Sequence, residues 1–235
     1  MKISHSFFRK YIANLAIIMS IILLGIVSYS GGVQGVFSSS TISAIYSGNT
    51  QNNAVSLMFN VYMGNEYVED ILNILEQKQL KATFFVGGVW VNKNEDCFKK
   101  IVESKNEIGS HGYWHKDHDK ISDDQQINEI VMTDELVKNI CGIKMDLFAP
   151  PSGAFNKQTL QIANSLGYKT IMWSLDTIDW RDKNVELITQ RSSKAKAGDF
   201  VLMHPTQCTV KALPTIIENI MSKGLKILTV SDNLK

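Results

Sequence analysis

Residues 110–119 read Ser-His-Gly-Tyr-Trp-His-Lys-Asp-His-Asp and hold three of the five histidines in the chain. Two of them, His111 and His115, stand four positions apart. On a helix this spacing places both rings on one face, where they can reach the same ion. Neutral imidazole is a good ligand for zinc and related divalent metals. The spacing also fits two histidines that bind no metal and are either exposed to solvent or hydrogen-bonded in the core between a strand and a helix. The surrounding sequence is therefore needed to choose between a metal site and this alternative.

Short apolar runs alternate with amphipathic stretches on both sides of this segment. The runs predict strands at residues 54–59, 82–86, 107–109, 145–148, 168–173, 200–203 and 225–230. The stretches between them predict helices at 67–79, 97–104, 122–140, 156–166, 185–195 and 213–222. Such alternation implies parallel strands joined by right-handed crossovers. We therefore expect an α/β fold, an incomplete (β/α)7-type barrel.

The longest predicted helix has the clearest end signals. Ser122 is its expected N-cap, and Gln125, three residues later, is the expected capping-box partner. Gly142 is expected to terminate the helix. Its apolar positions, including Ile127 and Ile130, are expected to face the core.

The N-terminal sequence is typical of a targeting segment. Three basic residues, Lys2, Arg9 and Lys10, precede an apolar run over residues 11–27. Residues 1–30 are therefore expected to be a signal peptide or an uncleaved signal anchor of borderline spanning length. The domain would then lie outside the cytoplasm, held at the cell membrane by one N-terminal pass, or secreted if the segment is cleaved. Residues 31–51 predict a flexible linker, which leaves residues 52–235 as one domain.

Composition excludes several classes of function. The formal net charge of +1 lacks the basic excess of a nucleic-acid-binding protein. No Gly-rich dinucleotide fingerprint or P-loop follows the first predicted strand, which disfavours nucleotide binding. The three cysteines, Cys97, Cys141 and Cys208, are odd in number and form no C-x-x-C, so we expect ordinary small apolar residues rather than a disulfide framework.

Polar residues gather in the segments that follow the predicted strands. These segments hold four of the five histidines together with Asp176 and Asp179. In a β/α barrel the loops at the carboxyl ends of the strands build the site. We therefore predict a functional site at this end.

Several of these segments resemble motifs of the polysaccharide deacetylase family. The resemblance is carried by residues 81–87 (second strand), 106–115 (metal motif), 150–153 (Arg-Pro-Pro-Tyr-Gly turn), 173–180 (Asp-Trp motif) and 202–204 (Leu-x-His). The match is colinear from about residue 54 to residue 233. It implies a metal-dependent hydrolase that removes N- or O-acetyl groups from peptidoglycan or chitin-like glycans.

The family's first motif, Thr-Phe-Asp-Asp-Gly, falls on residues 58–62 and is altered. Asn60 and Val61 stand where the family has its general base and its third metal ligand. An amide cannot take a proton from water, and an isopropyl group cannot bind a metal. Ala149 replaces the arginine that precedes Pro-Pro in the family.

The resemblance assigns roles to the residues that remain. It implies that His111 and His115 bind a divalent metal, expected to be zinc, with cobalt, manganese or nickel as alternatives. The resemblance implies that His204 protonates the leaving amine and that Asp179 orients the His204 ring. Glu66 is the candidate catalytic replacement for the lost carboxylates, although it also reads as an ordinary acid at a helix N-terminus.

Other residues on the same loops could contact a sugar. The aromatic ones suit sugar stacking, although some could belong to the core. The candidate substrate-binding residues are Asn60, Trp90, Tyr113, Trp114, Pro151, Ser152 and Trp180. Asp117 and His118, beside the metal motif, are further candidates for a replacement ligand.

Two functions remain open from the sequence, and we favour the first because of the family resemblance. The first is a monomeric polysaccharide deacetylase with a rebuilt first motif and weakened activity. The second is a catalytically impaired, glycan-binding pseudoenzyme anchored at the cell envelope. The missing residues at positions 60, 61 and 149 favour the second, whereas the retained histidines favour the first.

Overall fold

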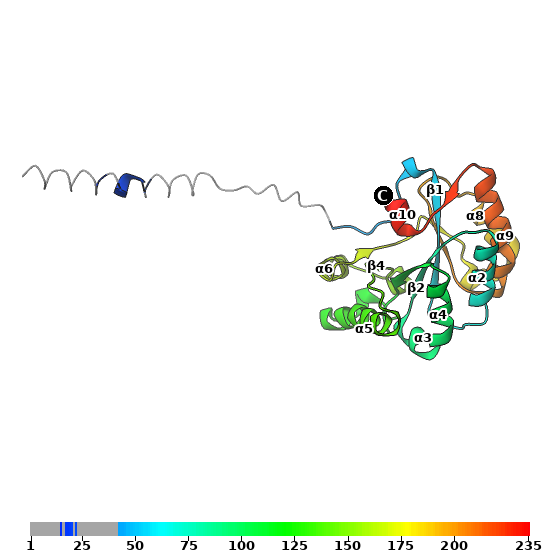
Figure 1. Cartoon of the computed structure of the whole chain (residues 1–235), viewed down its shortest axis with the longest axis horizontal. Coiled ribbons are helices and arrows are strands. Elements are labelled where there is room, and N and C mark those ends of the chain that lie inside the picture. Colours follow the sequence, from blue (N-terminus) through cyan, green and yellow to red (C-terminus); the bar gives the residue numbers. More distant parts are fainter. Residues whose placement is uncertain (1–14, 16, 21, 23–41) are drawn as a thin grey trace, which may run out of the picture. The chain divides into compact units, whose positions relative to one another are not determined.

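The computed structural model describes residues 15, 17–20, 22 and 42–235 (Figure 1). Residues 42–235 form one compact unit. Apart from the helical residues 15, 17–20 and 22, the predicted targeting segment lies outside the described residues. Within the described part of the chain, no helix has both the length and the apolarity needed to cross a membrane.

The unit is built on a parallel sheet that follows the predicted alternation. Its strands are β1 (Ala54–Val61), β2 (Thr83–Val86), β3 (Glu107–Ser110), β4 (Leu147–Phe148), β5 (Lys169–Thr170), β6 (Leu175–Asp176), β7 (Phe200–Met203) and β8 (Lys226–Ile227). They lie in the order β5-β4-β3-β2-β1-β7-β6, and β8 pairs with the start of β1. The end strands β5 and β6 have no ladder between them, so the barrel is open. The predicted incomplete (β/α)7-type barrel is confirmed.

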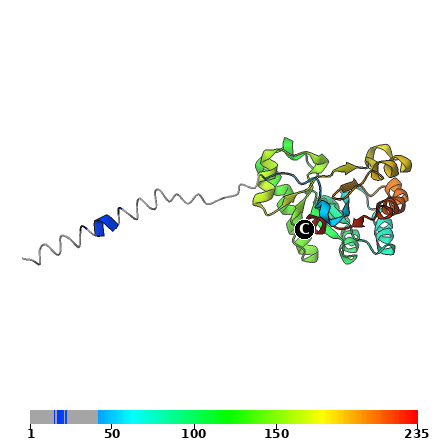
Figure 2. The same ribbon diagram turned by 90° about the horizontal axis from the view of Figure 1, so that it is seen from above.

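Helices cover the outer face of the sheet, as Figures 1 and 2 show. The helices of the unit are α2 (Val68–Gln77), α3 (Gly88–Lys93), α4 (Glu95–Glu103), α5 (Asp123–Cys141), α6 (Lys157–Ser165), α7 (Asp179–Asp182), α8 (Val185–Ser192), α9 (Gln207–Ser222) and α10 (Val230–Leu234). Of these, α10 packs Val230 against the inner face. Short 3-10 turns lie at η1 (Thr50–Asn52), η2 (His118–Lys120) and η3 (Pro151–Gly153). The predicted capping box between Ser122 and Gln125 is present, and Gly142 ends α5 in the left-handed conformation.

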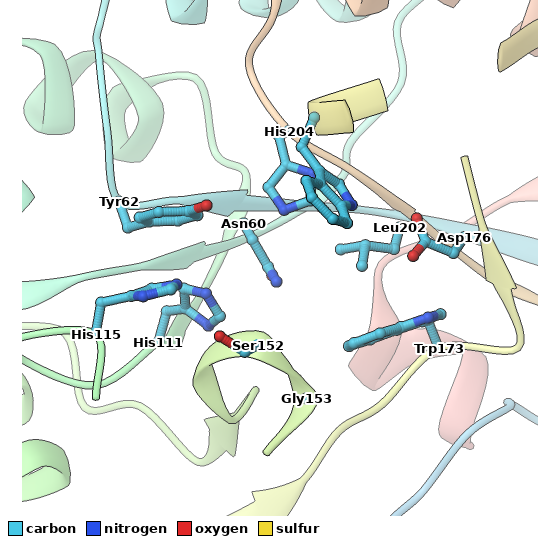
Figure 3. Close-up of a pocket in the computed structure, with 11 residues that line it drawn as sticks. Asn60, Tyr62, His111, His115, Ser152, Gly153, Trp173, Asp176, Leu202 and His204 are labelled. Atoms are coloured by element: carbon cyan, nitrogen blue, oxygen red, sulfur yellow. The ribbon is translucent and has the colours of Figure 1, made fainter. Parts of the chain in front are cut away.

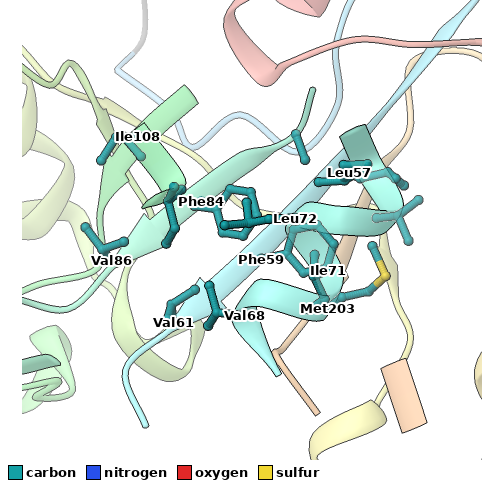
Figure 4. Close-up of a cluster of buried hydrophobic side chains, with 14 of the residues drawn as sticks. Leu57, Phe59, Val61, Val68, Ile71, Leu72, Phe84, Val86, Ile108 and Met203 are labelled. Carbon is teal, nitrogen blue, oxygen red and sulfur yellow. The ribbon is translucent and has the colours of Figure 1, made fainter. Parts of the chain in front are cut away.

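Alternation along β1 decides which side chains reach the site. Phe59 and Val61 belong to the core cluster beneath the helices, where Phe59 stacks on Phe84 with ring centroids 5.0 Å apart (Figure 4). Met58 belongs to a second buried cluster on the opposite face. Successive strand side chains point to opposite faces, so Asn60 shares the inner face with Met58. Position 60 therefore faces the barrel interior, and position 61 faces the helices.

The predicted linker is wrong for its last ten residues. Residues 42–51 lie within the compact unit, where the Ile45 N–H donates to the Thr170 carbonyl at 2.8 Å. The Gly48 N–H donates to the Gly198 carbonyl, also at 2.8 Å. Composition cannot reveal these backbone partners, which come from segments distant in sequence. Residues 31–41 lie outside the described residues.

Other boundaries also differ from the prediction. Helix α9 starts at Gln207, six residues before the predicted start, because the Thr206 side chain caps it by accepting the Thr209 N–H. Strand β6 and the helices α3, α7 and α10 were not predicted, and the last predicted strand, residues 225–230, is shorter and is followed by α10. The described cysteines are free, which agrees with the sequence prediction.

Candidate functional site

A cavity of about 300 Å³ opens at the carboxyl ends of the strands (Figure 3). It is lined by Asn60, Tyr62, His111, His115, Ser152, Gly153, Trp173, Asp176, Trp180, Leu202 and His204. The structure therefore brings together six of the residues predicted from sequence, from loops that are far apart in the chain. Tyr62, Gly153, Trp173, Asp176 and Leu202 complete the wall, although none was on the list of expected site residues.

His111 is held in one tautomer at the floor of the cavity. It directly follows β3 and is 1% exposed, and its Nδ1 lies 2.7 Å from the Ala149 carbonyl oxygen. A carbonyl only accepts, so Nδ1 carries the hydrogen and Nε2 is left with its lone pair. Burial lowers the pKa of His111 well below its usual value, and the neighbouring His115 adds to the effect. His111 is therefore a neutral imidazole with one available lone pair.

His115 faces the same cavity from an irregular loop. Its ring centroid lies 5.0 Å from that of His111, with the planes 68° apart. Its φ of 59° lies in the left-handed region. Burial also lowers its pKa. The expected juxtaposition is present, but a loop rather than a helical turn produces it.

Tyr62 occupies the centre of this group. Its ring stacks on His115, with centroids 3.7 Å apart and planes 20° apart, and meets His204 edge-on at 6.2 Å. Burial raises the pKa of the Tyr62 phenol, and the charge of Asp179 adds to the shift. The sequence held a signal for this residue, because position 62 matches the glycine of the family's first motif. A phenol ring thus fills space that a glycine leaves open.

The donor set does not fit a metal centre with three protein ligands. Asn60 contributes a neutral amide, and Val61 is buried in the core beneath the helices. Within residues 42–235 and the few described N-terminal ones, no three His, Cys, Asp or Glu side chains gather closely enough to hold an ion. Two imidazoles remain, which is one fewer than the three protein ligands of catalytic zinc sites.

Asp179 and His204 form a fully supported pair. Asp179 is completely buried, and its Oδ1 lies 2.8 Å from Nδ1 of His204. The same carboxylate accepts the backbone N–H groups of His204 at 2.6 Å and Trp180 at 2.9 Å, and the Thr209 hydroxyl at 2.5 Å. Because Nδ1 donates to the carboxylate, Nε2 of His204 is free to accept or hold a proton on the cavity side.

The remaining predicted residues lie outside the cavity lining. Glu66 is exposed, and its carboxylate accepts the Asn65 N–H at 3.0 Å, so the geometry gives it no contact with the histidines. Trp90 is 3% exposed, belongs to the core and donates its indole N–H to the Gly64 carbonyl. Pro151 is buried, and Tyr113 packs against Gly88 and Trp114. Trp114 is exposed on the loop that carries the two histidines.

Glu129 supports this loop from below. Its Oε2 accepts the backbone N–H groups of Tyr113 at 2.7 Å and Trp114 at 2.8 Å. Gly112 is needed beside it, since its φ is +72° and a Cβ there would lie 2.7 Å from the same oxygen. The sequence predicted that Ile127 faces inward, but Ile127 is exposed and Glu129 is buried instead. A buried acid on a helix gives no apolar signal, which is why the pattern missed it.

This architecture defines the chain as an open β/α barrel protein with a histidine-lined cavity at the carboxyl edge of its strands. A family model described as polysaccharide deacetylase matches residues 47–171. The chain belongs to the polysaccharide deacetylase family, as its motifs indicated.

Two curated relatives show the range of similarity. The uncharacterized protein YlxY of Bacillus subtilis is 40% identical over 189 residues, covering 80% of this chain and 59% of YlxY. A peptidoglycan-N-acetylglucosamine deacetylase of Bacillus cereus is 30% identical over 191 residues, covering 79% of this chain and 70% of that enzyme. The chain thus spans less than two thirds of the length of YlxY.

Solved structures include a protein described as a pseudoenzyme. The crystal structure of BA3943, a CE4 family pseudoenzyme from Bacillus anthracis, matches with a TM-score of 0.81 and 36% identity, covering 84% of this chain and 71% of that one. A BA3943 mutant with restored enzymatic activity matches with the same TM-score and 34% identity, covering 84% of this chain and 73% of the mutant.

Proposed function

We propose that this chain is a catalytically impaired polysaccharide deacetylase that binds cell-envelope glycan in the cavity beside His111 and His115. The observation that carries the proposal is the position of Tyr62, which stacks on His115 within a site that lacks a third ligand. Asn60 cannot act as the general base that activates water. The general base and the third metal ligand, which together would activate water to attack the acetyl group, are therefore missing.

Glycan binding is supported by the wall of the cavity. Trp180 lines it and is 53% exposed, and Trp114 on the histidine loop is 47% exposed. Large aromatic faces open to solvent suit stacking against sugar rings. The Bacillus cereus relative acts on peptidoglycan by its name, and BA3943 is described as a pseudoenzyme. The first supports peptidoglycan, or a chitin-like polymer, as the glycan bound here, and the second supports impaired activity.

The proposed location follows from the N-terminal sequence. The basic residues and the apolar run over residues 11–27 support a single N-terminal membrane pass with the domain outside, or secretion after cleavage. We propose a monomer at the cell envelope. Detection of the N-terminal segment in membrane-extracted protein distinguishes an anchor from a cleaved signal.

A second candidate function is slow deacetylation, favoured by the intact Asp179 and His204 pair. A carboxylate that fixes the histidine tautomer leaves Nε2 able to protonate a leaving amine. Zinc is the metal expected for this reading and would supply Lewis acidity. The two imidazoles alone do not complete such a centre, so we derive no catalytic step from it.

The test of the first proposal compares binding with turnover. The full chain is incubated with N-acetylated peptidoglycan, and sedimented protein and released acetate are both measured. We expect binding without acetate release, and weaker binding for Trp180→Ala. Tyr46→Ala is the matched control, because Tyr46 is 47% exposed but is not among the residues that line the cavity. Absence of binding, or equal loss in both variants, would overturn the proposal.

A further inference from the structure

Asp176 is an acid on the cavity wall that makes one backbone hydrogen bond and no ion pair among the described residues. It ends β6, and its Oδ1 accepts the Ile178 N–H at 2.8 Å. Across the described residues, its carboxylate forms no ion pair. His204 and the guanidinium of Arg191 act on Asp176 only from a distance. The imidazole bonds to Asp179, and the guanidinium bonds to Asp182 and to the Thr177 carbonyl.

The neighbouring acid shows the contrast. Asp179 is buried, but it is compensated by His204 and by three further hydrogen-bond donors. Asp176 has one backbone donor. Burial raises the pKa of Asp176, as expected for a carboxylate whose charge is poorly compensated. A cation placed beside it would oppose that shift.

The rest of the wall suits a cation. No lysine or arginine is among the described residues that line the cavity. Trp173 and Trp180 line it, and aromatic faces attract ammonium groups. Figure 3 shows Asp176 beside Leu202 and Trp173, across the cavity from His111 and His115.

Asn60 is the second polar residue on this wall. It is 4% exposed, and its Oδ1 is buried without a hydrogen-bond partner in the described structure. That oxygen is closed to the cavity, so it offers nothing to a ligand. The Asp176 carboxylate is therefore the acceptor that the wall offers to a ligand that donates hydrogen bonds.

These observations identify a ligand class more narrowly than the proposed glycan binding on which they rest. We infer that the cavity prefers a sugar unit with a protonated amine, the deacetylated 2-amino sugar, and that Asp176 is its charge partner. The acetylated sugar is the competing ligand, because its acetamide is neutral and its methyl group could contact Leu202. The protein would then bind glycan from which another hydrolase has already removed the acetyl group.

Calorimetry on the full chain distinguishes the two ligands. The probes are a tetramer of β-1,4-linked glucosamine and the fully N-acetylated tetramer, at about pH 6, where an amine is protonated. We expect the glucosamine tetramer to bind about tenfold tighter, in line with a hydrogen bond to a charged group. Asp176→Asn should remove this preference by weakening binding of the glucosamine tetramer. Asp124→Asn is the charge-matched control, since Asp124 is exposed in the first turn of α5.

Each outcome has a defined meaning. Equal affinity for the two tetramers, or tighter binding of the acetylated one, would overturn the inference and leave the proposed glycan binding standing. A glucosamine preference that survives in Asp176→Asn would also overturn it. Failure to bind either tetramer would contradict the proposed function as well.

Discussion

Tyr62 lies flat against His115, with ring centroids 3.7 Å apart and planes 20° apart. The residue sits at the end of β1, the strand that also places Asn60 in the cavity and Val61 in the core. Three consecutive positions thus depart from the deacetylase motif, each with a different physical effect. Asn60 lacks the carboxylate of the general base, Val61 lacks the metal ligand, and Tyr62 adds a ring beside the histidines.

Restoring the three positions together should create a metal site. The variant Asn60→Asp, Val61→Asp, Tyr62→Gly supplies two carboxylates and removes the ring. The carboxylate at position 61 has to turn out of the core beneath the helices to reach the metal, and the glycine at position 62 gives the backbone the freedom to do so. We expect about one tightly held zinc ion per chain, by elemental analysis after dialysis. Its metal-free form should melt lower than the wild type, since Val61 is fully buried and an aspartate there is unpaired. Added zinc should recover this loss.

The single variant Tyr62→Phe is the control for this restoration, because it keeps the stacked ring and adds no ligand. It should gain no zinc. If the triple variant also stays free of zinc, the lost motif does not explain the missing metal centre.

Asp179→Asn should destabilise the fold. All four groups that bond to Asp179 donate hydrogen bonds to it. The amide of asparagine replaces one accepting oxygen with an NH2 donor, so at least one of these groups loses its acceptor. We expect a loss of about 3 kcal/mol in the free energy of unfolding, measured by urea denaturation. Asp176→Asn, with one donor facing it, should lose less than about 1 kcal/mol. Similar losses in the two variants would show that the four donors around Asp179 stabilise its charge no better than the single donor stabilises that of Asp176.

Gly112→Ala should be more costly than Gly142→Ala. Both glycines have a φ of +72°, so both substitutions carry a left-handed penalty of about 1–2 kcal/mol. A Cβ at Gly142 meets nothing within 4 Å, whereas one at Gly112 lies 2.7 Å from Oε2 of Glu129. Thermal denaturation of the two variants isolates the contact with Glu129. Equal melting temperatures would show that the histidine loop does not depend on it.

Stability should fall as the pH is lowered, partly through His118. Burial lowers the pKa of His118 from 6.5 to about 4, although the Gln126 side chain opposes the shift. No ring nitrogen of His118 reaches hydrogen-bond geometry with a partner in the described chain. The folded-state pKa is depressed, so the unfolded state takes up the proton first, and stability present above about pH 6.5 is lost toward pH 4.

His118 alone should lower the free energy of unfolding by about 2 kcal/mol when the pH falls from about 7 to about 5. Urea denaturation at the two pH values should show a smaller difference in His118→Leu than in the wild type. An unchanged difference would mean that His118 is not buried as a neutral imidazole.

The sequence predicted those parts of the fold that depend on local patterns. The strand runs, the capping box at Ser122 and the glycine at position 142 are local signals, and each was found in the expected place. The pairing of Ile45 with the strand at Thr170 is not local, so composition assigned that segment to a linker. Glu129 was missed for the same reason, since its partners lie on another loop.

The site was only partly predictable. Family motifs named His111, His115, His204 and Asp179, and the structure gathers them near the strand ends, because the carboxyl edge of a barrel brings such loops together. They could not show that Tyr62 turns onto His115 or that Trp90 packs into the core, because both depend on side-chain packing.

Release of acetate from N-acetylated peptidoglycan in the presence of excess zinc tests the central claim most directly. The account predicts no release by the full chain above a protein-free blank, and detectable release once the three positions of the first motif are restored. Sustained, zinc-dependent release by the unmodified chain would contradict it. That result would show that two imidazoles, with Tyr62 between them and His204, are sufficient for deacetylation.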